Sequence, residues 1–275
     1  MLSDNGDVIP TLHTTSYGEQ GSRVVFLHGL FGQGRNWTQI GKALADRHRV
    51  LLVDLPDHGR SGWTQGPPEG KGFDLLEVAD LIAAAVGPEP FSLVGHSLGG
   101  KVAMVLALRH PELVERLCVV DISPVAYAKV SEFAGYIEAM RGLDLASLGQ
   151  RADAERALGK QVTNRTVCAF LLQNLRRDTR PDGSSGWRWQ ANLEGLRRDL
   201  PAFGDWPADR LGGSSYAGPV LWLGGAESDY ITDAYAADMD RWFPLNRRVT
   251  IKNAGHWLHS EQPDVFVEVL RRFVG

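Results

Sequence analysis

The stretch FSLVGHSLGGKVAMVLALRHPE, residues 91–112, places a serine between two glycines where an apolar run ends and a helical pattern begins. Serine is a poor residue for a helix interior, so geometry or chemistry must account for its position. Gly95-His96-Ser97-Leu98-Gly99 fits the pattern Gly-x-Ser-x-Gly, a strained strand-to-helix turn that lifts a serine hydroxyl clear of a sheet. A side chain at either glycine would collide with neighbouring backbone. The stretch predicts a nucleophile at Ser97.

Strands and helices alternate through most of the chain. Short runs rich in β-branched residues or leucine are apolar on both faces, as in parallel strands that are buried on both sides. Helical patterns separate these runs, so the sequence predicts an α/β fold with a doubly wound, mostly parallel sheet. The predicted strands are 23–29, 49–56, 91–97, 117–124, 219–225 and 247–256, and the predicted helices are 37–45, 74–86, 98–109, 234–242 and 264–273.

The alternation stops between Val125 and Tyr216, where helical patterns occur without a convincing strand. The predicted organisation is therefore an α/β core of residues 1–124 and 217–275, with a helical cap (lid) inserted over 125–216. Ligands of open α/β sheets bind outside the carboxyl ends of the strands, so the cap is expected to cover a site there. Trp187 and Trp189 alternate around Arg188 in this cap and are candidate pocket residues, although tryptophan more often serves packing.

Composition limits the possible partners. The 275 residues carry 29 Lys and Arg against 33 Asp and Glu, without a long run of one sign, so a nucleic-acid partner is not expected. The cysteines Cys118 and Cys168 are far apart and predict buried hydrophobic residues, not a metal or redox site. The first ten residues have no apolar signal region and no stretch approaches eighteen apolar residues, which predicts a cytoplasmic protein without a membrane span. A monomer or dimer is expected.

The serine needs a base, because its hydroxyl is a weak nucleophile until its proton is removed. Histidine titrates near neutral pH, and the chain has eight. His256 follows the last predicted strand in NAGHWLHSEQP, just before the final helix, which places it at the same sheet edge as Ser97. His259 lies in or beside the helix start, and His96 adjoins the serine and cannot easily turn back to it. The remaining candidates are interpreted as turn or surface residues: His28, His58 and His110.

Two positions compete for the acid that orients this histidine. Asp121 follows one strand in VVDISP, and Glu227 or Asp229 follows a later strand in GGAESDYIT. Either strand end can serve, because the acid has only to hold the imidazole in the correct orientation. On the residues alone, both positions stay open.

These motifs together resemble the α/β-hydrolase superfamily over nearly the whole chain, through FLHGLFGQGRNW, VDLPDHGRS, VGHSLGGKVAM, VVDISPV, LGGAESDYI and NAGHWLHSEQP. The chain looks most like the small abhydrolase-domain esterases that carry GHS-Leu/Met-GGK and DISPV. Many superfamily members have their acid in a Gly-x-x-Asp turn, at the position where this chain has Ser228. In relatives with a serine there, the resemblance implies that Asp121 supplies the acid and that Ser228 adds a hydrogen bond, with Asp229 as the alternative.

The resemblance also implies an activity. Backbone N–H groups hold the developing oxyanion in this fold, one of them from Leu98 after the nucleophile. The second is expected from Leu30 in HGLFG, with Phe31 as the alternative donor and a pocket residue. The implied function is a serine hydrolase for carboxylic esters or thioesters of small to medium acyl groups, working through an acyl-enzyme without metal or cofactor. The alternatives are a carbon–carbon bond hydrolase, a cofactor-free haloperoxidase or perhydrolase, and a ligand receptor without turnover.

Overall fold

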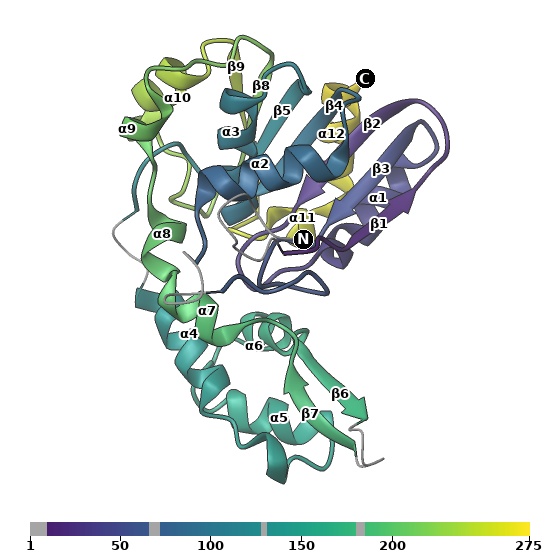
Figure 1. The fold of residues 1–275 in the computed structure, drawn as a ribbon, viewed down its shortest axis with the longest axis vertical. Helices are drawn as coiled ribbons and strands as arrows, with labels where there is room; N and C mark the ends of the chain where they lie inside the picture. The colour runs from purple at the N-terminus through teal and green to yellow at the C-terminus, as the bar shows by residue number, and fades with distance from the viewer. Residues whose placement is uncertain (1–9, 66–71, 128–130, 180–184) are drawn as a thin grey trace.

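The structure is a computed structural model that describes residues 10–65, 72–127, 131–179 and 185–275, so the N-terminal residues 1–9 used above lie outside it. Its main sheet has the strand order β1-β3-β2-β4-β5-β8-β9 (Figure 1). β1 pairs antiparallel with β3, and every other neighbouring pair is parallel. The strands are β1 (Thr14–Tyr17), β2 (Ser22–Leu27), β3 (His48–Val53), β4 (Phe91–His96), β5 (Val114–Val120), β8 (Val220–Gly225) and β9 (Asn246–Ile251).

All six predicted strands are present, and the reason lies in how the sheet is covered. Val25 and Leu27 of β2 pack into the core beneath α2 (Leu75–Val86) and α3 (Leu98–Arg109). Val24 and Phe26 pack on the opposite face, with α1 (Thr38–Leu44) and α12 (Pro263–Val274). Both faces are therefore apolar, which makes the strand sequences continuous hydrophobic runs. The edge strand β1 was not predicted because TTSY is exposed and has no such run.

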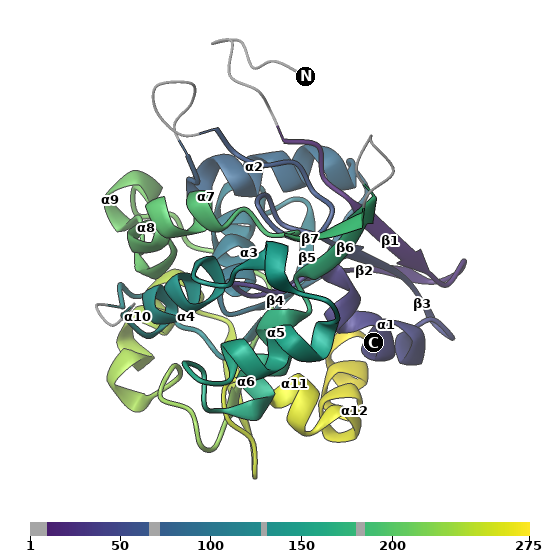
Figure 2. The same cartoon turned by 90° about the horizontal axis from the view of Figure 1, so that it is seen from below.

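The segment between β5 and β8 covers the carboxyl ends of the strands. Figure 1 places α4, α5, α6, α7 and the β6–β7 hairpin together beyond one end of the sheet, and Figure 2 shows α4, α5 and α6 in front of β4. The end of the predicted insertion packs on the core instead, since the Trp206 and Trp242 rings lie 5.7 Å apart. The elements are α4 (Ser131–Arg141), η2 (Leu145–Ser147), α5 (Arg151–Leu158), α6 (Arg165–Leu172), β6 (Leu175–Thr179), β7 (Ser185–Trp189), α7 (Leu193–Arg198), α8 (Leu200–Gly204) and α9 (Ala208–Leu211).

The expectation that this segment has no strand was wrong. β6 and β7 form a two-stranded antiparallel sheet. In β6 only Leu175 is buried, and the residues from Arg177 to Thr179 are exposed, so the strand shows neither an apolar run nor a regular alternation. The remaining elements are η1 (Gly34–Trp37), η3 (Asp233–Tyr235), α10 (Ala236–Trp242) and α11 (Leu258–Glu261).

Two further predictions concern burial and membranes. Cys118 and Cys168 are both buried and free, as predicted. Across the described ranges, no helix combines the length and the apolar character needed to cross a membrane.

Candidate active site

Ser97 occupies a sharp turn between β4 and α3. Its backbone has φ 52° and ψ −118°, a strained conformation for a residue with a side chain. A Cβ atom at Gly95 would lie 2.3 Å from the carbonyl oxygen of Gly99, and one at Gly99 would lie 2.5 Å from that of His28. Only glycine fits at either position, because the turn brings the helix backbone against the strands. The local sequence thus presents the serine at the carboxyl edge of the sheet.

His256 lies on the loop between β9 and α11, with its ring held by Asp121. The distance from His256 Nδ1 to Asp121 Oδ2 is 2.7 Å, and the Asp121 side chain is completely buried. The carboxylate accepts this bond, so we assign the ring proton to Nδ1, which leaves Nε2 as an acceptor. The Ser228 hydroxyl also donates to Oδ2 over 2.5 Å, and the Gly225 N–H donates to Oδ1 over 3.2 Å. These donors fix the orientation of the carboxylate.

The two candidate acids differ in position. Asp121 follows the end of β5 and has φ 52°, so the backbone is strained here as it is at Ser97. The residues Glu227 and Asp229 are exposed. Among the acids of the described residues, Asp121 is the one within hydrogen-bond distance of the His256 ring.

His96 supports the loop that carries His256. The Nε2 atom of His96 lies 2.8 Å from the His256 carbonyl oxygen, and the two rings are 4.7 Å apart. Burial, together with the neighbouring His259 and His256, holds the pKa of His96 well below 6.5. The ring is therefore neutral at pH 7 and donates its Nε2 proton to the carbonyl. The sequence argued against His96 as the base because it adjoins Ser97. That position gave no indication of the hydrogen bond to the His256 carbonyl.

The turn after β2 contains the other expected donors. The Gly32 N–H donates to the Gly29 carbonyl over 2.9 Å, and Phe31 has φ 61°. His28 braces this turn: its Nδ1 lies 2.8 Å from the Gly29 oxygen, and its Nε2 accepts from the Leu55 N–H over 3.0 Å. Burial is the main cause that lowers the pKa of His28 to about 3. Leu98, by contrast, is the first residue of α3, where backbone N–H groups have no acceptor within the helix.

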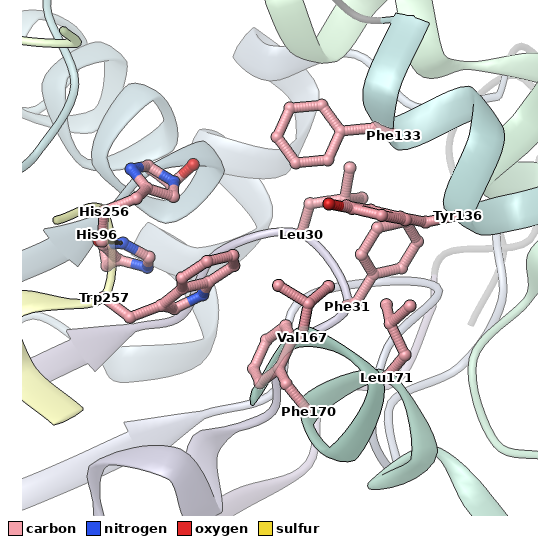
Figure 3. A pocket seen from close by; sticks show the side chains of 11 residues that line it. Leu30, Phe31, His96, Phe133, Tyr136, Val167, Phe170, Leu171, His256 and Trp257 are labelled. Atoms are coloured by element: carbon pink, nitrogen blue, oxygen red, sulfur yellow. Dashed lines mark hydrogen bonds between the residues drawn. The ribbon is translucent and has the colours of Figure 1, made fainter. Parts of the chain in front are cut away.

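A pocket lies over Ser97 and His256 (Figure 3). Core residues and cap residues both line it, and the side chains labelled in Figure 3 face one another across it. Because the cap contributes aromatic and aliphatic side chains, the pocket wall is mainly apolar. The core side consists of Leu30, Phe31, His96, Ser97, His256 and Trp257, and the cap side consists of Phe133, Tyr136, Val167, Phe170 and Leu171.

Trp187 and Trp189 do not line this pocket, contrary to expectation. Their indole N–H groups donate to the carbonyls of Leu148 and Met140, over 3.0 and 3.1 Å. Two residues apart on β7, both rings face the same way and pack within the cap. The cap residues that do reach Ser97 lie on α4 and α6. The sequence indicated helices here but could not show which face would meet the core.

Lys101, one turn after the nucleophile, joins α3 to both ends of the cap. Its side chain is 1% exposed, and its Nζ donates to the carbonyls of Val125, Gly204 and Asp205 over 2.8, 2.8 and 2.5 Å. Val125 precedes α4, whereas Gly204 and Asp205 end α8. The Nζ also lies 5.0 Å from the centre of the Tyr127 ring. The Gly204 carbonyl also accepts from the Tyr127 N–H over 2.8 Å, so this lysine and Tyr127 together hold the segment before α4 against the end of α8.

Metal binding was not expected, and the described part of the chain offers no group of three or more His, Cys, Asp or Glu side chains placed to hold an ion.

Comparison with known proteins agrees with this arrangement. The sequence profile described as alpha/beta hydrolase fold matches residues 22–263. The chain is 35% identical over 257 residues to the mouse (Mus musculus) sn-1-specific diacylglycerol lipase ABHD11, covering 91% of this chain and 80% of that protein. It is 27% identical over 253 residues to esterase YbfF of Escherichia coli strain K12, covering 92% and 93%.

A solved structure described as a marine microorganism esterase is 31% identical, with a TM-score of 0.86 over 96% of this chain and 99% of that one. The sheet order, the strained serine between β4 and α3, and these similarities together show that the chain belongs to the α/β-hydrolase family.

Proposed function

We propose that this protein is a serine hydrolase that cleaves carboxylic esters or thioesters of small to medium acyl groups. The observation that carries the proposal is the shared pocket of Ser97 and His256, in which Asp121 holds the histidine ring with Nε2 free to accept a proton. A strained serine, a base and an orienting acid are the parts that nucleophilic acyl transfer requires.

The reaction follows from these positions. His256 Nε2 removes the proton of the Ser97 hydroxyl as Oγ attacks the carbonyl carbon of the substrate. The N–H groups of Leu98 and Leu30 stabilise the oxyanion, and one such donor is typically worth about 3 kcal/mol of barrier. His256 then protonates the leaving group, which departs and leaves an ester on Ser97. A water molecule, deprotonated by the same Nε2, hydrolyses this acyl-enzyme and restores the serine.

The relatives support an ester as the substrate. One is named as a diacylglycerol lipase and two others are named as esterases. An ester, which is uncharged at its carbonyl, also suits a pocket whose cap side is made of aromatic and aliphatic side chains.

The proposal is tested by hydrolysis of p-nitrophenyl esters from acetate to long acyl chains. The Ser97→Ala variant should lower kcat by about 10⁶-fold, because catalysis is lost when the nucleophile is removed. Ser215→Ala is the matched control, since Ser215 is exposed, and it should behave as wild type. Full ester turnover by Ser97→Ala, or no cleavage of any ester by the wild type, would contradict the proposal.

A further inference from the structure

Two small pockets share the nucleophile Ser97, and most of their other lining residues differ. Both contain Ser97, Leu30 and Phe133 in their walls. The first, shown in Figure 3, is here called the α6 lobe and has His96, His256, Trp257, Val167, Phe170 and Leu171 on its wall. The second is called the α8 lobe and has Leu98, Ile122, Tyr127, Leu200, Phe203 and Tyr230 on its wall. The lobes are small, about 10 Å³ for the α6 lobe and 40 Å³ for the α8 lobe, so a substrate enters them only as the lining side chains move. An ester has an acyl part and a leaving group, and the two lobes offer one direction for each.

The position of His256 decides which arm enters which lobe. His256 must deliver its proton to the leaving oxygen or sulfur, so the leaving group has to lie on the side where the imidazole is accessible. The imidazole lines the α6 lobe. On the other side, the Tyr230 ring stacks on His256 with centroids 4.4 Å apart and itself faces the α8 lobe. We infer that the leaving group occupies the α6 lobe and the acyl chain occupies the α8 lobe, an inference that depends on the proposed function.

The α8 lobe has the chemistry of a site for an uncharged acyl chain. Among the described residues, no charged side chain lines it. The Tyr127 hydroxyl is already engaged, because it donates to the Tyr230 carbonyl over 2.7 Å. Leu200 and Phe203, both buried, form its outer wall. A carboxylate on the acyl chain would have no charged partner here, so the free-energy cost of removing it from water would not be compensated.

The α6 lobe continues toward a polar surface. Val167, Phe170 and Trp257 also line a wider cavity beyond it. The rim of that cavity carries charged side chains, among them Arg165 and Glu155. A leaving group that extends from the α6 lobe along α6 and the loop of Trp257 would therefore meet polar and charged side chains at its far end. The expected substrates combine an uncharged acyl chain with an extended leaving group that has a polar end.

The test crosses two ester series with one variant in each lobe. In the first series the acyl chain of p-nitrophenyl esters is lengthened, and in the second the alcohol of acetate esters is lengthened and acid release is titrated. Leu200→Ala should raise kcat/KM for long acyl chains relative to short ones by roughly tenfold and leave the alcohol series unchanged. Phe170→Ala should raise kcat/KM for long alcohols relative to short ones and leave the acyl series unchanged. Each variant is the control for the other.

Stability is separated from selectivity by Leu200→Val, which makes a smaller cavity and should shift the acyl profile in the same direction. The lobe assignment is wrong if the wild type cleaves esters but Leu200→Ala changes the alcohol profile, or if Phe170→Ala changes the acyl profile. In either case the hydrolase proposal still stands. Absence of any ester cleavage by the wild type overturns both.

Discussion

Replacing Lys101 with methionine should loosen the connection between α3 and the two ends of the cap. Methionine keeps the apolar stem of the side chain but removes the ammonium, whose three bonds go to the carbonyls of Val125, Gly204 and Asp205. At 1% exposure the site admits almost no water to replace them. The Gly204 carbonyl keeps the Tyr127 N–H as a donor, so the variant takes the bond away from two carbonyls that have no second donor of this kind, those of Val125 and Asp205.

The size of the effect follows from those two carbonyls. A buried polar group left unpaired costs about 1–3 kcal/mol. Burial lowers the pKa of Lys101 to about 7, which shows that the buried ammonium is itself costly, so the low end of that range applies. Two groups at about 1 kcal/mol give a loss of roughly 2 kcal/mol in the free energy of unfolding. For a domain of this size that is a fall of about 4–8 °C in Tm.

Urea unfolding followed by circular dichroism measures this loss. Lys160→Met is the matched control, because it makes the same chemical change at an exposed cap position and should stay within about 0.5 kcal/mol of wild type. The acyl-chain profile should also broaden in Lys101→Met, since Gly204 and Tyr127 line the α8 lobe. Equal unfolding free energies for Lys101→Met and wild type would refute the reasoning.

The remaining predictions concern the acid, its support and pH. Asp121→Asn should lower kcat by about 10⁴-fold because the histidine loses its correct tautomer, whereas Asp229→Asn should leave ester hydrolysis intact; the reverse result would move the acid to Asp229. Ser228→Ala should lower kcat by about tenfold, through loss of one hydrogen bond to the carboxylate, and an unchanged kcat would remove Ser228 from the site. Burial is the main cause that lowers the pKa of both His28 and His259 to about 3, so only the unfolded chain gains their protons as pH falls below 6.5. The contribution of these two neutral histidines to the free energy of unfolding is complete above pH 6.5 and is lost toward pH 3. By pH 5 the loss is about 2 kcal/mol for each histidine, and urea titrations at pH 7 and 5 should show it.

The core of the fold was predictable because its strands carry a strong signal. Residues 24–27 of β2 and the Leu93-Val94 pair of β4 are buried and apolar in succession, which marks these strands as covered on both faces. The turn at Ser97 needs glycine at Gly95 and Gly99, because a Cβ atom at either position would meet backbone. The exposed strands β1 and β6 were missed because neither has a buried face to impose a pattern.

The residues around Ser97 were only partly predictable. His256 could be inferred because it directly follows a predicted strand. The carboxyl ends of parallel strands lie at one edge of the sheet, so this position places His256 at the same edge as Ser97. Two features depend on how the cap packs against the core. One is the lining of the pocket over Ser97 by Val167 and Phe170, and the other is the set of hydrogen bonds from Lys101 to the cap. Such long-range contacts join residues that are far apart in the chain, and local patterns do not encode them. The alternating tryptophans Trp187 and Trp189 misled for the same reason.

The central claim is that Ser97 is the nucleophile, and covalent labelling tests it most directly. The protein is treated with a fluorophosphonate, digested, and mapped by mass spectrometry. One adduct is expected, on Ser97, with loss of esterase activity in proportion to labelling and no adduct in Ser97→Ala. An adduct on a different residue, or an unlabelled Ser97 in protein that hydrolyses esters, would contradict it.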